Sequence, residues 1–406
     1  MKNNWLTSLG PGLLFAGAAI GVSHLVQSTR AGADFGFGLL WALILVNIFK
    51  YPFFQYGPRY AMATGESLID GYHKLGKGVL VMYFIITFAT MFTIQAAVTI
   101  VTAGLAANLF GITTNATTWS IIITIVCFVL LLIGKYKLLD RVIKLIIIIL
   151  TLSTLIAVSV AAFNNTQPLE FTQIFPSGTI EITFLIAFLG WMPAPLDISA
   201  WHSLWALEKQ KDNHQNYDTK KSIFDFNVGF IGTLLLAICF VALGTFVMYH
   251  SGMQFDNSAG KFAQQLINLY TENLGSGTSI FITVAAFTTM FSTTLTTLDA
   301  SPRSMARTTE LLFQKNIKGN YIGWIVLLSI GTIIILTLFI SNMKVMIEIA
   351  TIISFLTAPF YAIANFILIS SKHTPKEWHP STAMKVFSYL GIIFLIGFSI
   401  WYLMNL

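Results

Sequence analysis

Long apolar segments, separated by short polar stretches, follow one another along almost the whole chain of 406 residues. A helix needs about 20 mostly apolar residues to cross a bilayer, and this criterion predicts eleven membrane-spanning helices. They occupy residues 10–29, 38–62, 78–109, 117–134, 141–163, 180–206, 224–249, 278–299, 320–340, 345–370 and 385–404. Because apolar side chains surround these segments instead of forming one stripe, the medium around them is expected to be lipid.

The composition agrees with an all-α, polytopic membrane protein. Hydrophobic residues make up 55% of the chain and charged residues 10%, whereas a soluble domain carries about 25% charged residues. Cys127 and Cys239 both lie inside apolar segments, so we expect neither a disulfide framework nor a cysteine-based metal site. The sequence contains no glycine-rich phosphate loop and no His-Glu-x-x-His motif. We therefore expect neither an enzyme nor a resident cofactor.

The cationic residues lie mainly on one side of the predicted membrane. When the loops are assigned alternately to its two sides, nineteen of the 23 lysines and arginines fall on the side of the N-terminus. The remaining four are Arg30, Lys50, Lys261 and Lys344, of which Lys50 lies within the second span. By the positive-inside rule the N-terminus is cytoplasmic and the C-terminus extracytoplasmic, in the cell (inner) membrane. The distribution of the cationic residues, which give the chain a net charge of +6, thus indicates the orientation of the protein in the membrane and not a nucleic-acid partner.

Two spans contain residues that interrupt a helix near its centre. Span 1 contains Gly21-Val22-Ser23-His24, and span 6 contains Pro193 and Pro195, each of which lacks a backbone N–H. Interruptions five spans apart are typical of two inverted five-helix repeats that hold a substrate at the midplane between them. We therefore predict a first repeat at residues 1–163, a second at 164–370 and an eleventh span within 371–406.

The sequence resembles a known family at several of these places. The matching segments are Gly10-Pro11-Gly12-Leu13-Leu14, Ala31-Gly32-Ala33, Phe35-Gly36, Leu39-Leu40-Trp41, Ala63-Thr64-Gly65-Glu66 and Met192-Pro193. They are similar to segments of the Nramp family of divalent-metal transporters. The resemblance implies eleven spans, a leucine-transporter-like fold and a small ion as the substrate.

The metal-binding motif of that family has diverged in this chain. Its Asp-Pro-Gly-Asn sequence in span 1 corresponds here to Gly21-Val22-Ser23-His24, so the carboxylate is missing. The Met-Pro-His-Asn sequence of span 6 is reduced to Met192-Pro193, and the resemblance leaves the Met192 thioether and the Leu189 carbonyl as ligands. Span 3 contains no proton-relay carboxylate, because no Asp or Glu occurs between Asp70 and Asp140. Gln95 is the polar side chain that comes nearest to such a role. We therefore expect weak or absent proton coupling.

The remaining polar groups at membrane depth are candidates for the substrate site, because burying a charge there costs about 2.5–3.5 kcal/mol. We select Gly21, Ser23, His24, Leu189, Met192 and Asp197 as substrate or metal residues, and His202 as a proton carrier. Each has a structural alternative. His24 would bond a freed carbonyl, Met192 would pack in the core, and Asp197 would cap the helix that restarts after Pro195.

Span 8 contains hydroxyl side chains at seven of the ten positions from 288 to 297. Ser292 and Thr293 are similar to the Ser/Thr pair that faces span 1 in sodium-coupled transporters of the leucine-transporter fold, so they are candidates for a sodium site. The alternative is that these hydroxyls bond to their own helix and pack against neighbours.

Two functions remain open at this point. One is a secondary transporter that moves a divalent metal cation by alternating access through an altered site. The other is a sodium-coupled or uncoupled transporter of a small organic or anionic solute, in a chain that has lost the metal site of the family. In both cases we expect a monomer whose partners are its substrate and the membrane lipid.

The charge distribution gives the first testable prediction. A reporter fused after Leu406 should be extracytoplasmic, whereas a reporter inserted near Gln215 should be cytoplasmic, because the positive-inside rule fixes both ends of the intervening spans. Accessibility to an impermeant label measures both positions. Finding the two reporters on the same side would contradict the eleven-span assignment.

Overall fold

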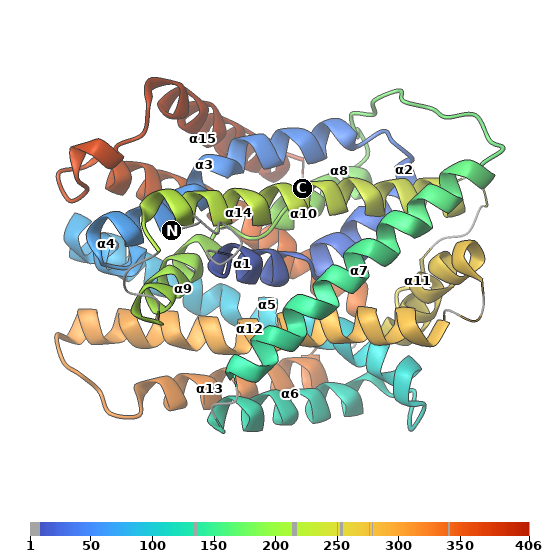
Figure 1. The fold of residues 1–406 in the computed structure, drawn as a ribbon, viewed down its shortest axis with the longest axis horizontal. Coiled ribbons are helices and arrows are strands. Elements are labelled where there is room, and N and C mark those ends of the chain that lie inside the picture. Colours follow the sequence, from blue (N-terminus) through green and yellow to red (C-terminus); the bar gives the residue numbers. More distant parts are fainter. Residues whose placement is uncertain are drawn as a thin grey trace, which may run out of the picture.

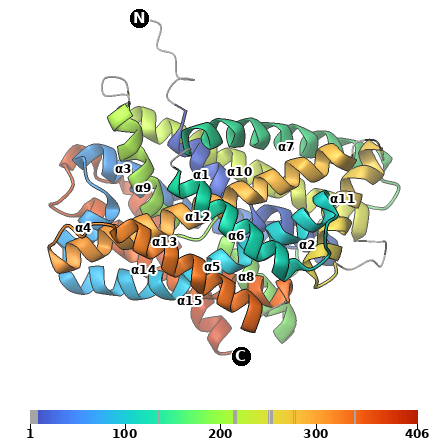
Figure 2. The same cartoon turned by 90° about the horizontal axis from the view of Figure 1, so that it is seen from below.

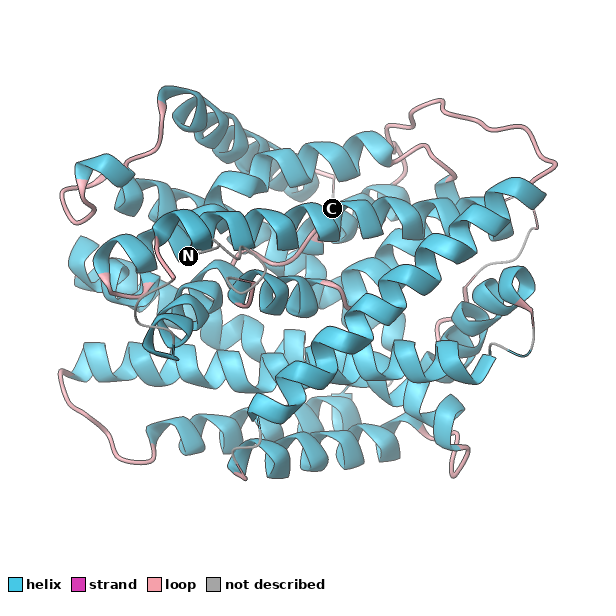
Figure 3. Ribbon diagram, viewed as in Figure 1, coloured by secondary structure: helices cyan, strands magenta, loops and turns pink. Residues whose placement is uncertain are grey.

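The structure is a computed structural model, and it describes residues 9–133, 136–212, 217–249, 251, 255–275, 277, 279–339 and 342–405. Every regular element in these ranges is a helix (Figure 3). The first half of the chain forms α1 (Pro11–Ala19), a π-helical turn η2 (Ser23–Ser28), α2 (Thr29–Phe35), α3 (Leu40–Thr64), α4 (Leu68–Leu75), α5 (Lys77–Phe110), α6 (Ala116–Leu132) and α7 (Tyr136–Asn164). The second half forms α8 (Thr179–Trp191), α9 (Ile198–Asp212), α10 (Thr219–Met248), α11 (Ala259–Leu274), α12 (Ser279–Phe313), α13 (Asn320–Ile334), η4 (Ile335–Phe339), α14 (Met343–Ser370), η5 (Lys376–Trp378) and α15 (Thr382–Leu403).

Each of the eleven predicted spans coincides with a helix or with a pair of helices. Six helices of the described chain are long and apolar enough to cross a membrane by themselves: α5, α10, α12, α13 with η4, α14 and α15. A bent pair, α1 with η2 and α2, forms a seventh. The other four predicted spans correspond to α3, α6, α7 and the pair α8 and α9. The prediction of an all-α, multi-pass membrane protein is confirmed.

The structure also contains helices that the hydropathy pattern does not predict. α4 and α11 are short and lie between spans, and α12 continues to Phe313, well beyond the predicted end of span 8 at residue 299. Hydropathy detects the immersed part of a helix, whereas hydrogen bonding continues into the polar part. This explains why α12 is longer than the predicted span.

The helices that contain the breaks lie inside the bundle. α1 lies between α10 and α12, and α7 crosses these two long helices obliquely (Figure 1). α2 also packs on α10, α9 packs on α3, and α8 packs on α14. The view in Figure 2 likewise shows α1 beside α10, with α6 and α13 on another face of the bundle. Both broken spans are therefore surrounded by continuous helices.

Glycines allow the first span to approach α10 closely. A Cβ atom on Gly229 would lie 2.1 Å from the carbonyl oxygen of Gly12, and one on Gly32 would lie 2.0 Å from the carbonyl oxygen of Val241. The carboxylate of Asp225 on α10 accepts hydrogen bonds from the N–H groups of Gly10 (3.0 Å) and Gly12 (2.8 Å). Since the first N–H groups of a helix have no partner within it, Asp225 fixes the beginning of α1.

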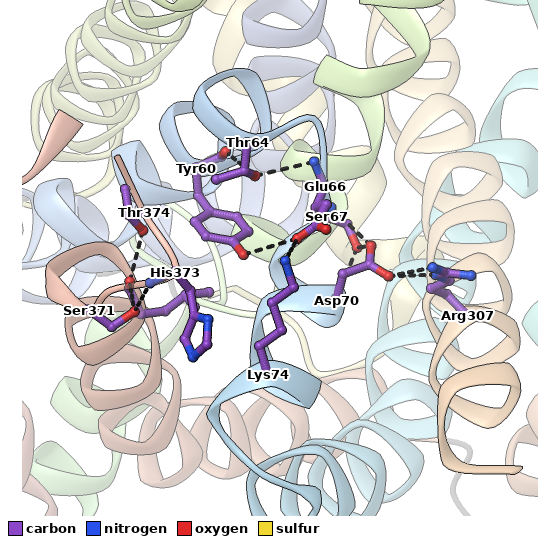
Figure 4. Close-up of polar contacts among 11 residues, drawn as sticks. Tyr60, Thr64, Glu66, Ser67, Asp70, Lys74, Arg307, Ser371, His373 and Thr374 are labelled. Atoms are coloured by element: carbon purple, nitrogen blue, oxygen red, sulfur yellow. Dashed lines mark hydrogen bonds and ion pairs between the residues drawn. The ribbon is translucent and has the colours of Figure 1, made fainter. Parts of the chain in front are cut away.

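A polar network joins α3, α4 and α12 on the side that the charge pattern predicts to be cytoplasmic (Figure 4). Ser67 and Asp70 form a reciprocal capping box at the beginning of α4. Arg307 of α12 donates to the same Asp70 carboxylate, with an Nε distance of 2.9 Å. Glu66 and Lys74 form an ion pair at 2.5 Å. Partly exposed ion pairs add little stability, but together these contacts fix the ends of three helices relative to one another.

The packing of α1 on α10 gives the second prediction. Gly229→Ala should lower the melting temperature of the purified protein, since the added methyl group would overlap the Gly12 carbonyl, and overpacking costs about 1–3 kcal/mol. Gly232→Ala on the same helix is the matched control, because nothing lies within 4 Å of the added Cβ atom. Equal melting temperatures for the two variants would contradict the close contact.

Candidate functional site

Both predicted helix breaks are present in the structure. In the first span, α1 ends at Ala19 and the helix restarts as η2 at Ser23, with a bend of 47° between the two parts. In the sixth span, α8 ends at Trp191 and α9 begins at Ile198. The residues between these two helices include both prolines, so the chain there is not helical. The two breaks expose backbone carbonyls inside the bundle.

A small cavity lies between the two breaks. Its walls include Ser23 of η2, Trp191 of α8, Trp201 of α9, and Thr293 and Thr297 of α12. Its volume of about 20 Å³ is room for about one water molecule. Most of its lining is apolar, and its lining contains no acidic or basic side chain.

The hydroxyl groups of this cavity have already donated their hydrogens to protein acceptors. Ser23 Oγ donates to the Ala19 carbonyl at 2.6 Å. Thr297 donates to the Gln95 side chain at 2.6 Å, and Thr293 donates to the Gly17 carbonyl at 3.2 Å. Each oxygen is left with lone pairs, so these groups are suited to accept from an N–H donor or to contact a cation.

Both ring nitrogens of the predicted site residue His24 contact carbonyl oxygens of the protein. The side chain is fully buried. Nε2 lies 2.9 Å from the Thr233 carbonyl oxygen, and Nδ1 lies 3.0 Å from that of Ala19 and 2.7 Å from Ser23 Oγ. Binding of a cation by this ring would require one of these contacts to break. In this conformation His24 links η2 to α10.

The other predicted residues of the first break lie close to the cavity. Ser23 is part of its wall. A Cβ atom on Gly21 would lie 3.0 Å from side-chain atoms of Thr293, so the threonine fills the space beside the position of the missing family carboxylate. Met192 is fully buried, and its sulfur lies 3.9 Å from Ser28 Oγ. The thioether thus faces η2 across the two breaks.

The predicted Leu189 carbonyl contacts a side chain that the sequence analysis did not select. Lys50 of α3 is fully buried. Its Nζ donates to the carbonyls of Leu189 and Gly190, at 2.7 Å each, and to that of Ala194 at 3.4 Å. The sequence signal for this contact was a lysine within a predicted span. A charge there costs about 2.5–3.5 kcal/mol and therefore needs a partner.

Asp197 is buried at the beginning of α9, and its Oδ1 atom has no hydrogen-bond partner. The N–H groups of Ile198 and of Asp197 itself contribute hydrogen bonds to the carboxylate. The N–H groups of Ile198, Ser199 and Ala200 also donate to backbone carbonyls at 3.3, 3.1 and 2.9 Å. Asp197 borders a narrow gap that is too small for a water molecule in this conformation, and Ile94 and Pro195 line both this gap and the cavity described above.

The predicted proton carrier His202 lies in aromatic surroundings. Its ring stacks on Phe15, with centroids 5.7 Å apart, and also contacts Phe226 and Trp205. Both ring nitrogens are buried without a hydrogen-bond partner. The ring is not part of the cavity lining, and this conformation offers it no polar group to exchange a proton with.

The two candidates for a sodium site face different surroundings. Thr293 lines the cavity and contacts the Gly17 carbonyl of α1. Ser292 Oγ is buried and has no hydrogen-bond partner. Within the described ranges, no three His, Cys, Asp or Glu side chains are grouped so that they could hold a metal ion.

The contacts of His24 give the third prediction. His24→Ala should lower the free energy of unfolding by about 1–3 kcal/mol, because the buried ring leaves a space and its single N–H no longer donates to the Thr233 or the Ala19 carbonyl. His73→Ala is the control, since that side chain is partly exposed on α4. The measurement is the melting temperature of each purified variant. A stable His24→Ala protein would show that the contacts are dispensable and that the ring is free for another role.

The sequence and the structure were compared with those of known proteins. The family model described as natural resistance-associated macrophage protein-like, Nramp, matches residues 12–405. An uncharacterized protein of Pasteurella multocida (strain Pm70) is 34% identical over 410 residues, which cover 98% of this chain and 93% of that protein.

Two solved structures show the same fold. The manganese transporter of Eremococcus coleocola, in complex with an aromatic bis-isothiourea compound, is 15% identical, with a TM-score of 0.72 over 97% of this chain and 85% of that one. MhsT in complex with L-phenylalanine is 12% identical, with a TM-score of 0.62 over 96% and 98%. The fold is thus that of the leucine-transporter class. By its sequence match along almost the entire length, the chain belongs to the Nramp family of membrane transporters.

Proposed function

We propose that the protein is an alternating-access transporter that moves a divalent metal cation through an altered site, in which Asp197 supplies the negative charge. The manganese transporter among the structural neighbours supports the substrate class. The change of site follows from the sequence, because Gly21 replaces the carboxylate that the family has in span 1. In this proposal the negative charge of the substrate site lies at the second break instead of the first.

The pairing of helices supports alternating access between two inverted repeats. The first span packs on the seventh (α1 and α2 on α10), and the sixth packs on the second (α9 on α3). The third packs on the eighth (α5 on α12), and the fourth packs on the ninth (α6 on α13). Exchanging each span for its counterpart five positions away leaves this set of contacts unchanged. Such a symmetric pairing is expected of two inverted repeats that exchange conformations between the outward-open and inward-open states.

The unpartnered Oδ1 atom of Asp197 is the observation on which the substrate site rests. A buried carboxylate oxygen without a hydrogen bond is costly, even though neighbouring backbone N–H groups contribute hydrogen bonds to the carboxylate. The beginning of α9 favours a negative charge there through the helix dipole. A cation that binds this oxygen would satisfy it.

The side chains around the closed gap beside Asp197 offer further oxygen ligands, and the gap has to widen for a cation to enter. Thr90, Thr357 and Tyr361 line it with hydroxyl groups. Thr90 donates to the Ile86 carbonyl at 3.0 Å and Thr357 to that of Ile353 at 2.9 Å, so their oxygens retain lone pairs. Carboxylate and hydroxyl oxygens suit hard cations such as Mn²⁺. The oxygen ligands of this site are harder than the soft sulfur ligand that Met192 would provide.

We also propose that proton coupling is weak. At the interface of α5 and α12, Gln95 bonds to Thr297 and donates to the Thr294 carbonyl at 3.2 Å. An amide side chain does not exchange a proton at neutral pH. The third span therefore offers no side-chain relay at this position.

A second candidate function is transport of a small organic solute of low charge. The lining of the cavity between the breaks supports it, because two tryptophans and several aliphatic side chains face the space and the hydroxyls present acceptor oxygens. Aromatic walls with a few polar groups are typical of sites for small organic molecules.

Binding of Mn²⁺ by purified protein gives the fourth prediction. Mn²⁺ should raise the melting temperature of the wild-type protein, because a ligand that binds only the folded state stabilises it. Asp197→Asn, which keeps the shape of the side chain, should weaken this response by about tenfold or more in Mn²⁺ concentration.

Glu208→Gln is the matched control, since Glu208 is an exposed carboxylate on the same helix, and its response should equal that of the wild type. Amino acids and carboxylates are tested in parallel. A wild-type protein that responds to one of these and not to Mn²⁺ would overturn the metal proposal in favour of the second candidate.

A further inference from the structure

The ammonium group of Lys50 contacts a set of backbone carbonyl oxygens at the end of α8, as a bound metal cation would. Its three N–H groups point to three carbonyl oxygens, those of Leu189, Gly190 and Ala194. A lysine ammonium has three donors, so this set of contacts is complete. The side chain is fully buried.

The position favours a positive charge for two reasons. The last carbonyls of a helix have no partner within it, and the C-terminal end of its dipole is negative. Carbonyl oxygens at a break in a membrane helix form a cation site in many transporters. Here the occupant of that site is covalently tethered to α3.

The negative charge that faces this ammonium is Asp197. Asp197 follows three residues after Ala194, whose carbonyl accepts from Lys50, and both side chains are buried at the same break. Within the described residues neither side chain forms an ion pair shorter than 4 Å, so the two charges compensate each other at this break only through space. Removing one member of a buried pair leaves the other uncompensated, which is strongly unfavourable. The break is therefore neutral as long as both charges remain.

This arrangement matters for an alternating-access carrier that has released its cargo. A bound cation neutralises the carboxylate, but after release the empty carrier has to turn back with that carboxylate still buried. Without a compensating charge this return would be the unfavourable step of the cycle. Without a return step, the carrier exchanges cargo across the membrane and accumulates none.

We propose that Lys50 is a tethered counter-ion, whose ammonium neutralises Asp197 in the empty carrier and so permits net transport of the cation. The inference rests on the proposed function, because it requires a cationic cargo that binds at Asp197. In this proposal Lys50 acts on the return step through the charge of Asp197 and does not contact the transported cation.

Proteoliposomes with radiolabelled Mn²⁺ separate the return step from the loaded step. Net uptake into empty vesicles requires the return of the empty carrier, whereas exchange with Mn²⁺ inside the vesicles does not. Lys50→Met, which keeps the length of the side chain, should lower net uptake relative to exchange by about tenfold or more. Lys50→Arg keeps the charge and should recover part of the net uptake. Asn47→Leu, a buried substitution one turn away on α3, should leave the ratio of the two rates unchanged.

A double-mutant cycle on the melting temperature tests the charge pairing without any transport. Lys50→Met should lower the melting temperature of the wild type more than that of Asp197→Asn, because the second background no longer contains the buried carboxylate. Independent effects of the two substitutions would overturn the pairing. Equal losses of net uptake and exchange in Lys50→Met would overturn the counter-ion role. Failure of the wild type to exchange Mn²⁺ would refute the proposed cargo, while the cycle would still report on the pair.

Discussion

The backbone carbonyls that a broken helix exposes inside a membrane need partners, since lipid offers none. In this protein the end of α8 is satisfied by the ammonium group of Lys50, which reaches it from the neighbouring α3. The first break uses side chains of its own segment, because Ser23 and His24 both contact the Ala19 carbonyl. These contacts keep two non-helical segments inside an otherwise continuous helical bundle.

The two breaks differ in how they are fixed to the rest of the bundle. The first span is held along α10 by glycine contacts, by the Asp225 carboxylate at its beginning and by His24 at its centre. The sixth span is attached to α3 through Lys50 and to α14 through Trp191, which donates to Ser354 at 2.8 Å. A movement of the first span therefore involves α10, whereas a movement of the sixth changes the environment of the buried charges.

The location of charge distinguishes this chain from the pattern that its family resemblance implies. A glycine occupies the position of the first-span carboxylate, and Thr293 fills the space beside it. The buried carboxylate of the sixth span lies at the same break as the carbonyls that a lysine of the second span contacts. In the cation site that we propose, a fixed negative charge is balanced by an internal positive charge, and a change in either is expected to alter both stability and binding.

The sequence by itself determined the all-α membrane architecture, the eleven spans and the two breaks, because lipid imposes length, apolarity and internal hydrogen bonding on every segment locally. It also identified Asp197 and His24 as costly groups at membrane depth. What these groups contact was decided by the tertiary structure. The Thr233 carbonyl that bonds to His24 and the Lys50 side chain that bonds to Leu189 lie on other helices. No periodicity in the chain encodes which helices become neighbours, so the partners of the buried polar groups emerge only when the spans pack together.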